Sequence, residues 1–93
     1  MSAAEALSLG ILNRVVPDDK LDQETMAWAE RMAAGPTEAL GRTKLLINSG
    51  YKNQLDQHLA QESSLIAETA RTEDFREAVK AFLEKRDPQF RGL

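Results

Sequence analysis

Apolar residues recur along much of the chain at the three- and four-residue spacing of amphipathic helices. The clearest stripe lies near the C-terminus and consists of Phe75, Val79, Phe82 and Leu83. These positions follow i, i+4, i+7 and i+8, so they line one face of a helix. A second stripe consists of Leu21, Thr25, Trp28, Ala29, Met32 and Ala33. This second stripe predicts that Trp28 and Met32 belong to a hydrophobic core.

The stripes and the residues that begin and end helices together predict five helices. We expect them at residues 2–10, 20–34, 37–49, 53–70 and from 72 to about 86. Ser2 and Glu5 have the spacing of a capping box, and Gly10 suits the left-handed position after a helix. Thr72 is a good N-cap, and the charges of the two acidic residues after it favour a helix N-terminus.

A different pattern lies between the first two predicted helices. Residues 11–16, ILNRVV, are rich in β-branched side chains and are followed by Pro17, which predicts a short strand or an extended segment. The sequence offers this strand no partner, and unpaired strand edges are unfavourable. We therefore expect a mainly α fold in which residues 1–17 form a lead-in helix and an orphan strand, and residues 18–93 form a helical region.

Composition restricts the function more than it defines it. The 93 residues are 42% apolar and 29% charged, with a net charge of −3, as in ordinary soluble globular proteins. The sequence has no basic face that would indicate nucleic-acid binding, and no apolar run approaches the length of a membrane span. The chain has no cysteine, which removes disulfides and thiolate chemistry and is compatible with a reducing cytoplasm.

Few residues are candidates for chemistry. His58 is the only histidine, and a catalytic zinc usually needs three protein ligands, so we expect it to pair with Glu62 rather than bind metal. Glu62 lies within an apolar stripe, where a carboxylate could act as an acid or base; a structural ion pair is the favoured alternative. Its candidate partners are Arg42, Lys44 and Arg71. Gly41 falls inside a predicted helix, which indicates close packing.

The last predicted helix carries an aromatic residue and a cation on one face. Phe82 and Lys85 are three residues apart, and Arg86 follows directly. A ring beside a mobile ammonium suits an adenine nucleotide, because the ring packs against the base while the lysine meets phosphate. Alternatively, Phe82 lies in the core and Lys85 is solvated at the helix C-terminus, where a cation is favourable. From the residues alone the second interpretation is favoured.

Three stretches carry a resemblance to a known family. SAAEALSLGILNRVVP, AERMAAGPTEALGRTKLLIN and AFLEKRDPQFRG resemble, in order and spacing, the C-terminal third of the crotonase superfamily of enoyl-CoA hydratases and isomerases. The resemblance implies the helical end of a crotonase-like α/β fold. In this interpretation residues 1–17 finish a spiral core, and residues 18–93 pack subunits into a homo-oligomer of the trimer type. LDQHLAQE and DFREAVKAFLEKRDPQF are most similar to the phenylacetate-pathway members.

The resemblance also implies which functions to expect. The substrate would be an acyl-CoA thioester, with coenzyme A as part of the substrate and no separate cofactor, in the cytoplasm. The family's catalytic amides and carboxylates lie upstream of the matching region, so we expect a fragment that is inactive alone and assign no catalytic residue. Phe82 and Lys85 would help hold the adenine end of coenzyme A. A stand-alone helical protein-interaction module is the alternative, and an intact small enzyme is the least supported.

Overall fold

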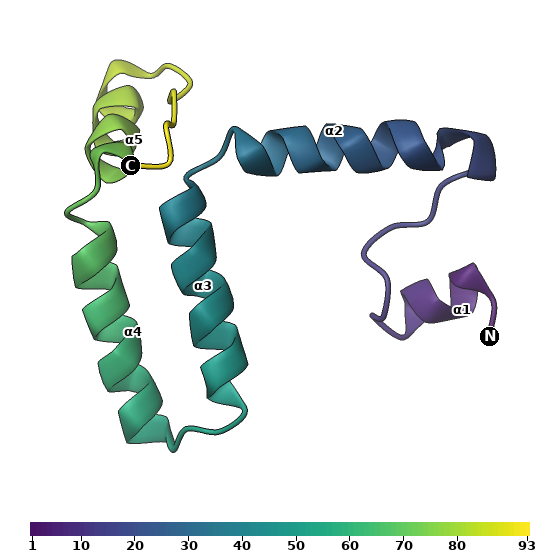
Figure 1. Cartoon of the computed structure of the whole chain (residues 1–93), viewed down its shortest axis with the longest axis horizontal. Helices are drawn as coiled ribbons and strands as arrows, with labels where there is room; N and C mark the ends of the chain where they lie inside the picture. The colour runs from purple at the N-terminus through teal and green to yellow at the C-terminus, as the bar shows by residue number, and fades with distance from the viewer. The chain divides into compact units, whose positions relative to one another are not determined.

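The computed structural model describes all 93 residues and is mainly helical (Figure 1). Its elements are α1 (Ala3–Ser8), a short 3-10 helix η1 (Asp18–Lys20), α2 (Leu21–Ala33), α3 (Thr37–Gly50), α4 (Leu55–Thr69) and α5 (Glu73–Glu84). The five predicted α-helices are confirmed, with small shifts at their ends. The chain forms two compact units, residues 1–30 and 31–93. The predicted boundary after residue 17 stays a prediction.

The first unit begins with the predicted capping box. The Ser2 hydroxyl accepts a hydrogen bond from the Glu5 amide at 3.2 Å, and the Ser2 amide donates to the Glu5 carboxylate at 2.6 Å. The backbone hydrogen bond from Ser2 lowers the pKa of the Glu5 carboxyl. The helix ends where Gly10 takes a φ of +71°, as its position predicts, and the Ile11 amide bonds the Ala6 carbonyl at 2.9 Å.

Residues 11–17 contain no strand, so the predicted orphan strand is wrong. The β-branched side chains favour extended backbone, but a strand also needs the hydrogen bonds of a neighbour. An ion pair connects the segment to α2 instead, with the Arg14 guanidinium 2.8 Å from the Glu24 carboxylate. Both side chains are exposed, so this pair adds little stability.

The second unit is built around a hairpin of α3 and α4, which lie side by side (Figure 1). The Asn53 side chain donates to the Gln61 side chain at 2.8 Å and fixes the connection between the helices. A Cβ placed on Gly50 would lie 3.2 Å from the His58 ring, so the helices approach closely there. Of the two glycines in α3, Gly50 rather than Gly41 therefore lies close to a neighbouring side chain. Nothing lies within 4 Å of a Cβ placed on Gly41, which corrects the prediction from its position.

The ion pairs of this hairpin also differ from those predicted. His58 makes no ion pair with Glu62, and its Nδ1 atom is buried without a hydrogen-bond partner. Arg42, one of the three candidate partners of Glu62, binds Glu38 at 3.1 Å and Glu68 at 3.6 Å instead. The Arg42–Glu68 pair connects α3 to α4.

Little of the surface is buried within this chain. The buried residues are Ala6, Asp74 and Ala81. Trp28 is 37% exposed and Met32 is 56% exposed, so their predicted place in a core is wrong for this chain. The periodicity places Trp28 and Met32 on one face of α2, but neither residue is fully buried. No helix is both long and apolar enough to cross a membrane.

Candidate functional site

The C-terminal tail folds back along α5 and is held by that helix's first turn. The Thr72 hydroxyl caps the helix by accepting a hydrogen bond from the Phe75 amide at 3.1 Å. The carboxylate of Asp74, which is only 3% exposed, accepts the Arg91 amide at 2.7 Å and the Gly92 amide at 2.8 Å. The Asp74 amide in turn donates to the Leu93 carbonyl at 3.0 Å. Asp74 therefore fixes the end of the chain with both its side chain and its backbone.

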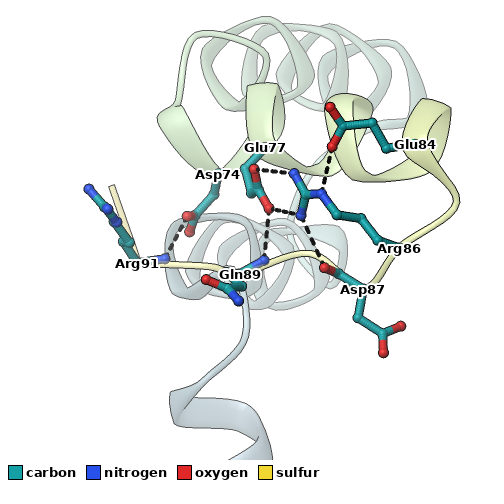
Figure 2. A network of polar contacts seen from close by, with 7 residues as sticks. All are labelled: Asp74, Glu77, Glu84, Arg86, Asp87, Gln89 and Arg91. Atoms are coloured by element: carbon teal, nitrogen blue, oxygen red, sulfur yellow. Dashed lines mark hydrogen bonds and ion pairs between the residues drawn. The ribbon is translucent and has the colours of Figure 1, made fainter.

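Arg86 connects the other end of α5 to the same tail (Figure 2). Its guanidinium forms two bonds with the Glu77 carboxylate, at 2.6 and 3.1 Å, and a third with Glu84 at 2.6 Å. Glu77 also accepts the Gln89 amide at 3.0 Å. The hydrogen bonds from Arg86, and to a smaller extent the bond from the Gln89 amide, lower the pKa of Glu77 from 4.5 to about 2. The same hydrogen bonds to Glu77 raise the pKa of Arg86.

Helix α5 ends at Lys85 in a left-handed turn. Lys85 has a φ of 53° and is the only residue other than glycine with a positive φ. Its amide bonds the Phe82 carbonyl at 3.2 Å, and the Arg86 amide bonds the Ala81 carbonyl at 3.0 Å. This pair of bonds is the Schellman motif, in which glycine is the usual residue at the left-handed position. A lysine there is strained.

The two predicted site residues lie at this turn, and their backbones are joined by the Lys85–Phe82 hydrogen bond. The Phe82 side chain is 82% exposed, so the alternative that places it in a core is wrong for this chain. Lys85 is exposed as well, and its ammonium makes no ion pair, whereas Arg86 beside it is fully engaged. The end of α5 thus presents an uncovered ring and a free cation three residues apart. This arrangement can stack on a flat base and attract an anion.

A groove of about 550 Å³ lies between α5 and the tail, but neither Phe82 nor Lys85 lines it. Its cations are Arg76, Lys80, Arg86 and Arg91, and its carboxylates come from Glu73, Asp74 and Glu77. Sequence reasoning missed the part that Asp74 and Glu77 play in holding the tail. Their spacing of three residues on one helical face, followed by Pro88 and Gly92 in the tail, is the signal that could have found it.

The family assignment follows from comparison with known proteins. The enoyl-CoA hydratase/isomerase family model matches residues 1–92. A probable enoyl-CoA hydratase of Rhodobacter capsulatus is 39% identical over 92 residues, which are 99% of this chain and 36% of that protein. The 1,2-epoxyphenylacetyl-CoA isomerase of Escherichia coli is 40% identical over 92 residues, 99% of this chain and 35% of that protein. The chain belongs to the enoyl-CoA hydratase/isomerase family.

Solved structures agree with the sequence comparisons. An enoyl-CoA hydratase subunit from Geobacillus kaustophilus superposes with a TM-score of 0.93 at 40% identity, over all of this chain and 36% of that one. An enoyl-CoA hydratase/isomerase from Mycobacterium abscessus gives a TM-score of 0.96 at 30% identity, over all of this chain and again 36% of that one. The chain therefore spans about a third of the length of these relatives.

Proposed function

We propose that this chain supplies the C-terminal helical part of an enzyme that acts on acyl-CoA thioesters. Within that part, Phe82 and Lys85 form a peripheral contact with the adenine nucleotide end of coenzyme A. The observation that carries the proposal is the uncovered ring of Phe82, 82% exposed, beside a lysine that makes no ion pair. Membership in the enoyl-CoA hydratase/isomerase family supplies the chemical class of the ligand.

The catalytic step itself is not assigned to any residue of this chain. Hydration or isomerisation of a thioester requires donors around the carbonyl oxygen and a carboxylic acid or base at the reacting carbons. Three carboxylates of α5 are engaged: Asp74 by the tail, and Glu77 and Glu84 by Arg86. We therefore expect no turnover of an enoyl-CoA substrate by this chain alone.

The finer parts of the proposal rest on resemblance. A phenylacetyl-type acyl group is supported by the 40% identity to the 1,2-epoxyphenylacetyl-CoA isomerase. A relative named as a hydratase reaches 39%, so the acyl group stays a prediction. A homo-oligomer and a cytoplasmic location are part of the same proposal. A stand-alone interaction module is not favoured, since the family match covers residues 1–92.

An NMR titration of the chain with coenzyme A tests the contact. We expect amide shifts centred on Phe82 and Lys85, with weak, millimolar-range binding because one edge of a pocket gains little against the entropy of association. Lys85→Ala should remove most of the shift. Lys52→Ala is the matched control, because Lys52 is also exposed but lies in the turn between α3 and α4. Shifts that are absent, or that survive in Lys85→Ala, would refute the contact.

A further inference from the structure

We propose that Arg86 is a positioning residue for Lys85. Arg86 holds Lys85 in the left-handed turn and keeps competing carboxylates away from it, so that Lys85 faces a ligand phosphate. This inference rests on the proposed coenzyme A contact and adds a role for its neighbour. Arg86 itself does not touch the ligand in this proposal. Its guanidinium is occupied by Glu77 and Glu84 (Figure 2).

The first step of the argument is the backbone of Lys85. Its φ of 53° lies in the region that side chains other than glycine rarely adopt, and glycine is the usual residue of this motif. Strained residues of this kind persist where the surrounding structure holds them, and they cluster at ligand contacts. A lysine where glycine fits better indicates that its side chain has a use there.

The second step is what holds the strained turn. The Arg86 amide closes the Schellman motif on the carbonyl of Ala81, a residue that is only 1% exposed. Its side chain then forms a two-pronged pair with Glu77, and Glu77 also accepts the Gln89 amide. Two residues that follow the turn, Arg86 and Gln89, are thus attached to α5. Such forked arginine–carboxylate pairs fix orientation as well as adding energy.

The third step concerns charge. Glu84 precedes Lys85 directly, and its free carboxylate would attract the lysine and repel a phosphate. Arg86 binds that carboxylate at 2.6 Å instead. Asp87, the next acidic residue, contributes only its backbone carbonyl to the network, at 3.1 Å from Arg86. Neither acid forms an ion pair with Lys85, and Arg86 engages the Glu84 carboxylate that lies next to the lysine in sequence.

The test compares coenzyme A with dephospho-coenzyme A, which lacks the ribose phosphate, as probes in NMR titrations of the whole chain. The wild-type chain should prefer coenzyme A, and Lys85→Ala should lose that preference. We expect Arg86→Gln to reduce the preference by about three- to fivefold, the size expected from one exposed ion pair. Arg71→Gln is the matched control, since Arg71 lies before the opposite end of α5 and forms no side-chain ion pair.

A second readout does not depend on the ligand. A strong cross-peak between the amide proton and the Hα of Lys85 reports its positive φ, and this peak should weaken in Arg86→Gln and remain in Arg71→Gln. If Lys85→Ala abolishes the preference while Arg86→Gln leaves both the preference and the cross-peak unchanged, the positioning role is refuted and the proposed function stands. If the wild-type chain shows no preference and Lys85→Ala has no effect, the proposed function fails, and with it this role.

Discussion

Replacement of Asp74 by asparagine should release the C-terminal tail from α5. Asp74 is 3% exposed, and its two carboxylate oxygens accept the Arg91 and Gly92 amides at 2.7 and 2.8 Å. Asparagine has the same shape but keeps only one acceptor oxygen, so one tail amide would face an NH₂ group. A buried hydrogen bond to a charged group contributes about 1.5–3 kcal/mol, and the leftover donor is costly as well. We expect Asp74→Asn to weaken tail attachment by about 2–3 kcal/mol, or roughly 30- to 150-fold.

Hydrogen exchange measured residue by residue by NMR reports this opening directly. The amides of Arg91 and Gly92 should exchange about 30- to 150-fold faster in Asp74→Asn, while amides within α3 and α4 change little. Glu73→Gln is the matched control, because it removes one negative charge from the same helix N-terminus at an exposed position. A helix-dipole effect alone would make the two variants equivalent. Equal exchange in both would show that the tail does not depend on the Asp74 carboxylate.

Three further predictions concern the same region. Gly92→Ala should cost more than the roughly 1–2 kcal/mol of left-handed strain alone, because its Cβ would overlap the Thr37 hydroxyl. Gly10→Ala, which has a similar φ and open space, is its control, and equal losses in local exchange protection would contradict the overlap. Lys85→Gly should slow amide exchange at the end of α5 by relieving about 0.5–1 kcal/mol of net strain while weakening coenzyme A binding; faster exchange would argue against strain. The pKa of Glu77 in the folded chain lies below its ordinary 4.5, so ionised Glu77 should stabilise the attached tail fully above about pH 4.5. This stabilisation should be lost as the pH falls towards 2, which the amide shifts of the tail would report. Glu77→Gln should remove this pH dependence.

The helices could be predicted from the sequence because their signals are local. The apolar period, the capping box of Ser2 and Glu5, and the N-cap Thr72 all act within one or two turns, and each is confirmed. The tail could not be predicted in the same way. Asp74 has the usual position of a charge that favours a helix N-terminus, but it is buried because residues 91 and 92 return to it. That return depends on the turn at Lys85, where lysine does not signal a left-handed conformation.

Glycine positions illustrate the same limit between helices. Gly41 and Gly50 both lie within α3, and the sequence cannot tell which of them faces α4. The structure places the His58 ring beside Gly50 and leaves open space at Gly41. The choice depends on the register of the hairpin, which is set by the connection around Asn53 and its bond to Gln61. The position of a glycine within a helix therefore predicts how much it destabilises that helix, but not whether a neighbouring side chain packs against it.

The two faces of α5 make different contacts. The end of the helix is held in place by its polar face, while large side chains on its apolar face stay exposed. The polar face carries Asp74 and Glu77, which bind the tail of the same chain. The apolar face carries Phe82 and Leu83, which are 82% and 74% exposed. Periodicity predicts that such a face is suited to burial, but not what covers it. Because Lys85 donates its backbone amide to the carbonyl of Phe82, the spacing of ring and cation is set by bonds within the helix end. We therefore expect the geometry of the proposed contact to depend on the turn at Lys85 and on the Arg86–Glu77 pair that follows it.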